Sequence, residues 1–376
     1  MDKSNFAMGH RRLESLDLLR GVVMFLLVFL QPVIVAVASA AGVPWLDAVA
    51  WHFDHEQWEG FRLWDLVMPL FLFMTGVSVP FSLGRYRRSG AGAAVWRKIF
   101  RRVLILWLLG MVVQGNLLAF DPDRIYLYSN TLQAIAIGYL IASAAFLLMS
   151  TRGQCVLWLV LFVAYWAPMT LAGDFTPDGN LAELIDRSVL GRFRDGSFTD
   201  ADGVRRFSDD YHYTWILSSL TFGVTVLTGS LCGQFLKKGR ERGAHTAAVL
   251  FGAGVAMTAG GWALGFQMPV VKRLWTSSMT LLSAGYCVML LATVYYLVDV
   301  AGRRRGTAWL KVYGMNSIAA YILGECINFR SVAHSVFHGF AQFMGEYYDA
   351  WLTFANFAIV FAILFVMHRR GVHLKI

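Results

Sequence analysis

The sequence predicts an all-α polytopic membrane protein with about ten transmembrane helices. Hydrophobic residues make up 57% of the 376 positions, and the mean hydropathy is +0.53. Charged residues make up only 15%, whereas a soluble protein carries about 25%. Apolar runs of about 18 to 25 residues recur along the chain, and each can cross a hydrocarbon core of about 30 Å. The net charge of +9 is therefore ascribed to membrane topology, and we expect no nucleic-acid partner.

We expect a single domain, residues 1–376, to hold all of the spans. Their predicted ranges are 18–41, 60–83, 103–119, 130–149, 154–172, 214–236, 246–266, 277–299, 308–329 and 350–367. Basic residues gather in alternate connecting segments, which predicts that these segments and both termini are cytoplasmic. The aspartate-rich segment 173–213 is then extracytoplasmic. Because it is longer than an ordinary connection, we expect a functional cap or a partly disordered flap there.

The first apolar run also has features of a secretory signal peptide. Basic residues precede it, and the small residues AVASAAG (36–42) follow. However, Asp17 lies inside the would-be basic region, and Asp17, Arg20 and Gln31 share one face of a helix. We therefore interpret this run as a retained span with a functional face.

The stretch His52–Leu83 combines a charged beginning with an apolar continuation. Asp54 followed by Gln57 has the pattern of a helix N-cap with a capping box, which predicts that His55 is the first helical residue. On that helix His55 would share a face with Trp58 and Asp65. Arg62 and Asp65, three positions apart, could form a local ion pair or line a cavity, and charged groups this close to hydrocarbon are expected to face the protein interior.

His55 is the strongest candidate for chemistry. At a helix N-terminus the dipole opposes an imidazolium, which favours a neutral ring able to act as a general base. Asp54, Glu56 and Glu59 could orient the ring. The alternative is an interfacial histidine without a catalytic role. We expect no metal site, because His52, His55 and these acids lack a third convergent ligand in the sequence.

Further polar residues stand near the ends of several spans. Interhelical hydrogen bonding explains each of them singly, but together they exceed what helix packing requires. We therefore hypothesise a polar cavity through the bundle. Its substrate-binding residues would be Asp54, Trp58, Asp65, Asn130, Gln133, Trp275 and Asn316.

Four segments of the chain are similar to a known family. The sequence resembles the heparan-α-glucosaminide N-acetyltransferases, and it resembles most the bacterial branch often labelled N-acetylglucosamine-related transporters. The matching segments are RLESLDLLRGVVMFLLVF (12–29), HEQWEGFRLWDLVMPLFLFMTGVSVPFSL (55–83), VKRLWTSSMTLLSAGYCVMLLATVYYLVDVAG (271–302) and YGMNSIAAYILGE (313–325).

The resemblance implies transfer of an acetyl group from cytosolic acetyl-CoA to an extracytoplasmic amino sugar or glycan. The family's catalytic histidine corresponds to His55. A functional asparagine of the family's first helix corresponds to Gln31, where the amide is kept but displaced by one methylene. The luminal N-terminal domain of the family has no counterpart before the first span. The phosphates of coenzyme A would need basic groups at the inner mouth, for which we expect Arg20, Arg85, Arg88 and Arg101.

Two other functions fit the same residues. In a secondary transporter for N-acetylglucosamine or its oligomers, the polar cavity would carry the sugar. An assembly or scaffold role is the third interpretation. The resemblance further implies a bacterial inner-membrane location, contact with membrane lipid and a homodimer.

Overall fold

The computed structural model describes residues 13–90 and 92–374, which divide into two compact units. The first unit comprises residues 13–40, 241–251 and 290–374, and the second comprises residues 41–240 and 252–289. Two long helices contribute to both units, α11 (Gly243–Gly265) and α12 (Ser277–Tyr295).

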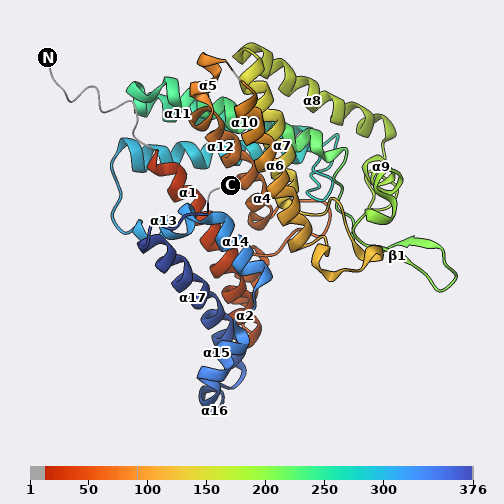
Figure 1. Cartoon of the computed structure of the whole chain (residues 1–376), viewed down its shortest axis with the longest axis vertical. Coiled ribbons are helices and arrows are strands. Elements are labelled where there is room, and N and C mark those ends of the chain that lie inside the picture. The colour runs from red at the N-terminus through yellow and green to blue at the C-terminus, as the bar shows by residue number, and fades with distance from the viewer. Residues whose placement is uncertain (1–12, 91, 375–376) are drawn as a thin grey trace. The chain divides into compact units, whose positions relative to one another are not determined.

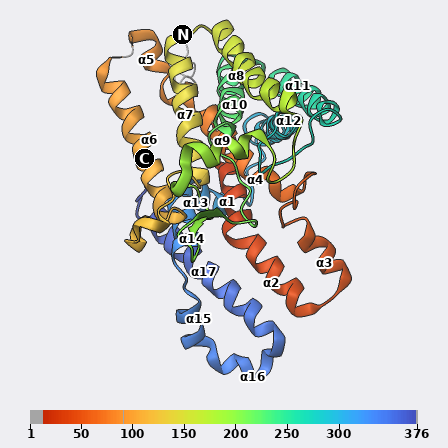
Figure 2. The ribbon, with the colours of Figure 1, turned by 90° about the vertical axis from the view of Figure 1, so that its right-hand side faces the viewer.

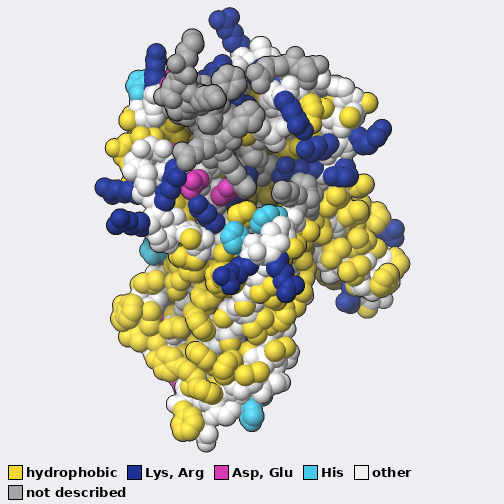
Figure 3. All heavy atoms as spheres, turned by 60° about the vertical axis from the view of Figure 1, so that its left-hand side comes forward, with side chains coloured by type: hydrophobic (Ala, Val, Ile, Leu, Met, Phe, Trp, Pro, Cys, Tyr) yellow, Lys and Arg dark blue, Asp and Glu magenta, His cyan; other side chains and the backbone are white. Residues whose placement is uncertain are grey.

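The first unit is built on α1, which continues through a π-helical turn into α2. Its α1 and α13 helices approach closely, since a Cβ added at Gly314 would lie 2.1 Å from the carbonyl oxygen of Asp17. In Figure 3, hydrophobic side chains cover the part of the surface where α2, α15 and α17 lie, as a lipid-facing surface requires. The elements are α1 (Glu14–Phe25), η2 (Leu26–Leu30), α2 (Gln31–Ala41), η8 (Tyr296–Val300), α13 (Ala308–Met315), α14 (Ser317–Cys326), α15 (Arg330–Phe337), α16 (Ala341–Met344) and α17 (Tyr348–Arg369).

The second unit is a helix bundle with one small hairpin. Polar side chains cap several of its helices: the side chains of Asn130, Ser150 and Asn180 accept hydrogen bonds from the first turns of α7, α8 and α9. The elements are α3 (Pro44–Trp51), η3 (Leu63–Leu66), α4 (Val67–Ser82), α5 (Gly84–Ser89), α6 (Ala93–Val113), α7 (Thr131–Leu148), α8 (Thr151–Ala172), α9 (Leu181–Leu190), β1 (Ser197–Thr199), β2 (Arg205–Phe207) and α10 (Ser218–Lys238).

Helices α4 and α10 form the most intimate pair in the second unit. Figures 1 and 2 show α4, α7 and α10 running side by side. A Cβ added at Gly76 would lie 1.9 Å from the carbonyl oxygen of Val226, and one at Gly229 would lie 2.0 Å from that of Phe73. Small residues at such positions let two membrane helices bring their backbones together. The pair therefore provides a rigid support for η3, which directly precedes α4.

Among the described residues, eight helices are long and apolar enough to cross a membrane. Two of the ten predicted spans lack a counterpart among these eight: α6 carries four basic residues in its first half, and the span 308–329 is broken at Asn316 into α13 and α14. The polytopic, all-α membrane class is confirmed. The eight ranges are Glu14–Ala41, Leu63–Ser82, Thr131–Leu148, Thr151–Ala172, Ser218–Lys238, Gly243–Gly265, Ser277–Val300 and Arg330–Arg369.

The segment 173–213 forms regular elements, for which its length had suggested either a functional cap or a partly disordered flap. It contains α9 and an antiparallel hairpin in which Ser197 faces Phe207. Glu183 and Arg194, both fully buried, form an ion pair of 2.6 Å. Asp186 accepts hydrogen bonds from the backbone N–H groups of Trp215 and Ile216 at 2.7 and 3.0 Å, which ties α9 to the start of α10. These contacts hold the segment on the start of α10. We call residues 173–213 the cap, and the functional role expected for it stays a prediction.

Candidate active site

His55 lies in an irregular segment between α3 and η3, and the predicted helix start at Asp54 is wrong. The helical structure begins at Leu63, with Arg62 as its N-cap. The Asp65 carboxylate accepts the backbone N–H of Arg62 at 2.9 Å, completing a capping box that lies eight residues beyond the predicted one. The carboxylate of Asp54 accepts only the N–H of the adjacent His55, at 2.8 Å.

The irregular segment is paired with a second loop of the same unit, which keeps it from forming a helix. Glu59 forms an antiparallel bridge with Val271, and the N–H of Gly60 donates to the carbonyl of Val270 at 2.8 Å. Gly60 has a φ of +132°, which side chains rarely tolerate. This pairing competes with a continuous helix from Asp54, which explains why the local capping pattern is not followed.

His55 and Asp65 form a hydrogen-bonded pair. The distance from His55 Nδ1 to Asp65 Oδ1 is 2.9 Å, and the side chains are 38% and 0% exposed. The other oxygen of Asp65 accepts the N–H groups of Arg62 and Glu56, so the carboxylate cannot rotate away. With Nδ1–H donating to Asp65, the lone pair of the imidazole is on Nε2.

Lys272, which the sequence did not single out, completes the cluster. Its Nζ lies 2.7 Å from Nδ1 and 3.0 Å from Nε2 of His55, and 3.5 Å from Oδ1 of Asp65. Since the distances to the two ring nitrogens are nearly equal, the ammonium lies against the ring rather than on the in-plane lone pair of either nitrogen, and its charge partner is the Asp65 carboxylate. One signal could have found this residue: Lys272 is a basic residue in a segment that the charge pattern predicts to be extracytoplasmic, where few basic residues are expected.

The electrostatic environment favours a neutral His55. Burial lowers the pKa of His55 below its ordinary value, and the nearby Lys272 charge lowers it further, against the hydrogen bond to Asp65, which raises it. Burial also lowers the pKa of Lys272 to about 8, although Asp65 opposes the shift. Burial thus favours a neutral ring, whereas the sequence had suggested a helix dipole as the cause.

Arg62 is paired differently from the prediction. Its guanidinium binds Glu56 through Nε at 2.9 Å and Nη2 at 3.1 Å, and it lies 4.1 Å above the ring of Trp51. Asp54, which is mostly exposed, is 3.7 Å from Arg62 Nη1. The expected ion pair between Arg62 and Asp65 is replaced by the backbone contact described above. The Asp65 carboxylate is therefore available to interact with the side chains of His55 and Lys272.

Trp58 joins the site to the segment 173–213. Its indole N–H donates to the carbonyl of Phe175 at 2.9 Å, and its ring contacts the ring of His212 edge to face, with centroids 5.8 Å apart. The next residue, Tyr213, lies against the guanidinium of Arg273, the neighbour of Lys272. The cap therefore reaches both loops that carry the His55 cluster.

Three other predicted substrate-binding residues of this unit have structural contacts. The amide of Gln133 accepts the N–H groups of Ser129 and Asn130 and donates to the carbonyl of Leu127, and Asn130 caps α7. Trp275 is buried with a φ of +52°, and its backbone N–H donates to the carbonyl of Lys272 at 2.9 Å. Trp275 thus closes the turn that presents Lys272, whereas Asn130 and Gln133 order the start of α7.

Gln31, Arg20 and Asn316 belong to the first unit. Gln31 is the first residue of α2, and Arg20 lies in α1. Asn316 is buried between α13 and α14, where its side-chain oxygen accepts the N–H of Leu374 at 3.3 Å. The assigned role of these three residues stays a prediction.

The predicted cofactor arginines of the second unit lie beyond the far end of α4 from Asp65. Arg85 contacts the ring of its neighbour Tyr86. Arg88 lies in α5, and its side chain is outside the described part of the structure. Arg101 is exposed on α6.

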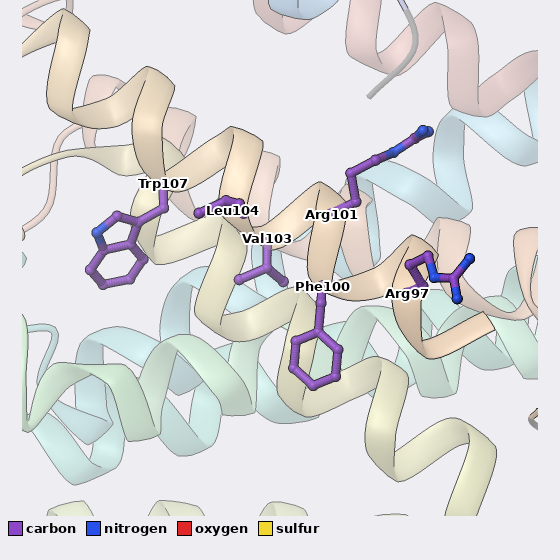
Figure 4. Close-up of a pocket in the computed structure, with 6 residues that line it drawn as sticks. All are labelled: Arg97, Phe100, Arg101, Val103, Leu104 and Trp107. Atoms are coloured by element: carbon purple, nitrogen blue, oxygen red, sulfur yellow. The ribbon is translucent and has the colours of Figure 1, made fainter. Parts of the chain in front are cut away.

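A groove of about 660 Å³ runs along α6 and includes two of its arginines. Figure 4 shows Phe100 and Trp107 on one side of the helix and Arg101 directed away from them. The lining is mostly apolar and comes from α6 alone, so this groove does not include the His55 cluster. Its residues are Arg97, Phe100, Arg101, Val103, Leu104 and Trp107.

Comparison with known sequences shows which protein family the chain resembles. The sequence model of the family described as heparan-α-glucosaminide N-acetyltransferase, catalytic, matches residues 12–184. Human and mouse proteins named heparan-α-glucosaminide N-acetyltransferase are 24% and 23% identical to the chain, over 90% and 84% of its length. The matches cover 55% and 54% of those proteins, so the chain spans about half the length of these relatives. These comparisons confirm the resemblance seen in the sequence: the chain is similar to the heparan-α-glucosaminide N-acetyltransferases, and its residues His55 and Asp65 lie inside the matched segment.

Proposed function

We propose that the protein is a transmembrane acetyltransferase that moves an acetyl group from acetyl-CoA to the amine of an amino sugar or glycan. The observation that carries the proposal is the His55–Asp65 pair, a partly exposed imidazole oriented by a buried carboxylate. This pair lies in the segment that matches the catalytic family model. The names of the human and mouse relatives suggest which reaction to test: transfer of an acetyl group to a glucosaminide.

The residues around His55 suit general-base catalysis of amide formation. The acceptor nitrogen would attack the carbonyl carbon of the thioester while Nε2 of His55 takes a proton from that nitrogen. The C–S bond then breaks, and the thiolate of coenzyme A leaves with the bonding electron pair. Asp65 stabilises the imidazolium that forms, as in other histidine–carboxylate pairs. Alternatively, Nε2 attacks the thioester first, and the acetyl-imidazole then passes the acetyl group to the amine.

Residues beside His55 could bind the sugar. The partly exposed indole of Trp58 offers a flat apolar surface for a sugar ring, and the exposed Asp54 carboxylate can accept hydrogen bonds from hydroxyl or ammonium groups. On binding, the acceptor amine would lie at Nε2 of His55. The cap residue His212, packed on Trp58, would border this position.

Exposed arginines suit the phosphates of the acyl donor. Among the described residues, neither Arg97 nor Arg101 forms an ion pair, and the two are four positions apart on α6. Arginine binds phosphate oxygens through paired N–H donors. Helix α4 has 16 residues and is about 24 Å long, so it separates the His55 cluster from Arg85 by most of a hydrocarbon core. The donor would therefore extend its thioester along the bundle toward His55.

The test uses purified protein, acetyl-CoA and glucosamine, with mass spectrometry of the products. We expect N-acetylglucosamine and free coenzyme A from the wild-type protein, and a loss of at least about 100-fold in His55→Ala, as expected for removal of a general base. His52→Ala is the matched control, because His52 is exposed and contacts Trp51 rather than Asp65. It should retain activity.

Binding of the donor is measured in the same preparations. His55→Ala should still bind coenzyme A, since the arginines that would hold the phosphates are unchanged. A wild-type protein that binds no coenzyme A would refute the acetyltransferase. Counterflow of labelled N-acetylglucosamine in proteoliposomes without acetyl-CoA would instead establish a transporter.

A further inference from the structure

Lys272 is the least expected member of the His55 cluster. Its side chain is only 7% exposed, yet it carries an ammonium group on a loop that connects two membrane-crossing helices. Burying a charge is costly unless a partner compensates for it. The position of Lys272 therefore requires an explanation from the groups that surround it.

The groups facing Lys272 come from both loops and from η3. Asp65 and Asp54 are the acidic neighbours, Arg273 is the basic one, and the ring of His55 lies against the ammonium. The buried carboxylate of Asp65 thus has two partners: the N–H of His55 at 2.9 Å and the ammonium of Lys272 at 3.5 Å. One positive charge is enough to balance Asp65, and Lys272 supplies it.

We propose that Lys272 is a positioning residue of this site, whose ammonium balances Asp65 and thereby keeps the imidazole of His55 uncharged. The inference deepens the proposed acetyl transfer, since a general base must be unprotonated to act. Without the ammonium, the carboxylate would draw a proton onto His55, and the imidazolium would become its counter-charge.

The inference predicts the sign of a pKa change. Removing the ammonium deletes the charge that lowers the pKa of His55 and leaves the hydrogen bond to Asp65 that raises it. A like charge at this distance disfavours the protonated imidazole and so lowers its pKa. In Lys272→Gln we therefore expect the pKa of His55 to rise by at least about one unit. Lys272→Arg keeps the charge and should leave the pKa close to its wild-type value.

The experiment reads the charge of His55 without using catalysis. Diethylpyrocarbonate modifies neutral imidazole, and His55 is 38% exposed, so the pH dependence of its modification reports its protonation. Mass spectrometry would follow the His55 adduct in the purified full chain, at pH values below the pKa of Lys272, which is about 8. Wild type, Lys272→Gln, Lys272→Met and Lys272→Arg would be compared, each normalised to its own plateau.

A matched control removes a lysine charge elsewhere. Lys238 is exposed at the end of α10, and Lys238→Gln should leave the His55 midpoint unchanged. Lys272→Met is the second neutral variant, with an apolar chain that suits the buried stem if the glutamine variant does not fold. The inference is overturned if the midpoint stays at its wild-type pH in the folded neutral variants, or if Lys238→Gln moves it equally.

The failure of this inference is distinguishable from failure of the proposed function. A raised His55 midpoint in a protein without acetyltransferase activity would support the charge balance and refute the acetyltransferase. If activity is present, the acid limb of the kcat/KM profile should move to higher pH in Lys272→Gln by the same amount as the modification midpoint. A lower kcat/KM at every pH, with an unmoved limb, would contradict the inference.

Discussion

The orientation of His55 depends on one carboxylate oxygen. Asp65 is fully buried, and its two oxygens together receive His55 Nδ1 and two backbone N–H groups. Such a carboxylate fixes both the tautomer and the direction of the Nε2 lone pair. The site therefore depends on Asp65 as much as on the histidine itself.

Asp65→Asn tests this dependence. The amide keeps the shape but not the charge, so the tautomer of His55 is no longer fixed, and we expect kcat to fall by roughly 10²–10⁴-fold with little change in KM. Asp47→Asn, on the exposed face of α3, is the control and should behave as wild type. Steady-state kinetics with acetyl-CoA and glucosamine would decide. An unchanged kcat in Asp65→Asn would remove Asp65 from the mechanism.

At this scale the sequence predicted His55 and its neighbours but not Lys272. Asp54, Trp58 and Asp65 lie within ten positions of His55, so a local pattern could reveal them. Lys272 is 217 positions away and reaches His55 only through the pairing of Glu59 with Val271. Such a contact is set by tertiary structure, and no periodicity in a single sequence encodes it.

At the scale of elements, the close contact of α4 and α10 supports the site. The short helix η3, which contains Asp65, continues directly into α4. The backbone of α4 contacts the backbone of α10 at Gly76 and Gly229. Any side chain at these positions must push the two helices apart, and core packing has little slack for such a shift.

Gly229→Ala should therefore destabilise the protein by about 1–3 kcal/mol. The added Cβ would lie 2.0 Å from the carbonyl oxygen of Phe73, which has no room to move. Gly252→Ala on α11 is the control, because no atom lies within 4 Å of its added Cβ; the better helix propensity of alanine should leave it neutral or slightly more stable. Thermal unfolding in detergent measures both. Equal stability of the two variants would contradict the packing argument.

The sequence predicted the elements better than their boundaries. Apolar runs gave the all-α class and most of the spans, because hydrocarbon thickness imposes their length. The start of the second span was misplaced, since Asp54 and Gln57 satisfy the local capping pattern while the competing cap of Asp65 depends on the fold around it. The sequence could not decide whether residues 173–213 are folded, for the same reason. The Glu183–Arg194 pair is buried only after α9 and the hairpin have packed.

For the whole molecule, the important property is that α4 connects two chemically different ends. The His55 cluster precedes α4, and the arginine-bearing helices α5 and α6 follow it. Since the range Leu63–Ser82 can cross a membrane, donor and acceptor would approach from opposite faces. The predicted cytoplasmic termini, homodimer and inner-membrane location stay predictions.

Reconstitution into liposomes tests this arrangement. With acetyl-CoA supplied on the face that bears Arg85 and Arg101, and glucosamine enclosed on the other, we expect product only on the acceptor side. Supplying both compounds on one face should give much less product from molecules of uniform orientation. His55→Ala vesicles are the control for leakage and for non-enzymatic transfer. Equal rates in all arrangements would contradict transfer across the bilayer.

The bridge between Glu59 and Val271 has a consequence for biosynthesis. A nascent chain that has emerged as far as α10 already contains α4, His55 and Asp65, but the loop that carries Lys272 has not yet been made. Until α11 and α12 are inserted, the irregular segment has no pairing partner, and nothing opposes a helix that begins at Asp54. The candidate active site can therefore assemble only after nearly three quarters of the chain has been synthesised.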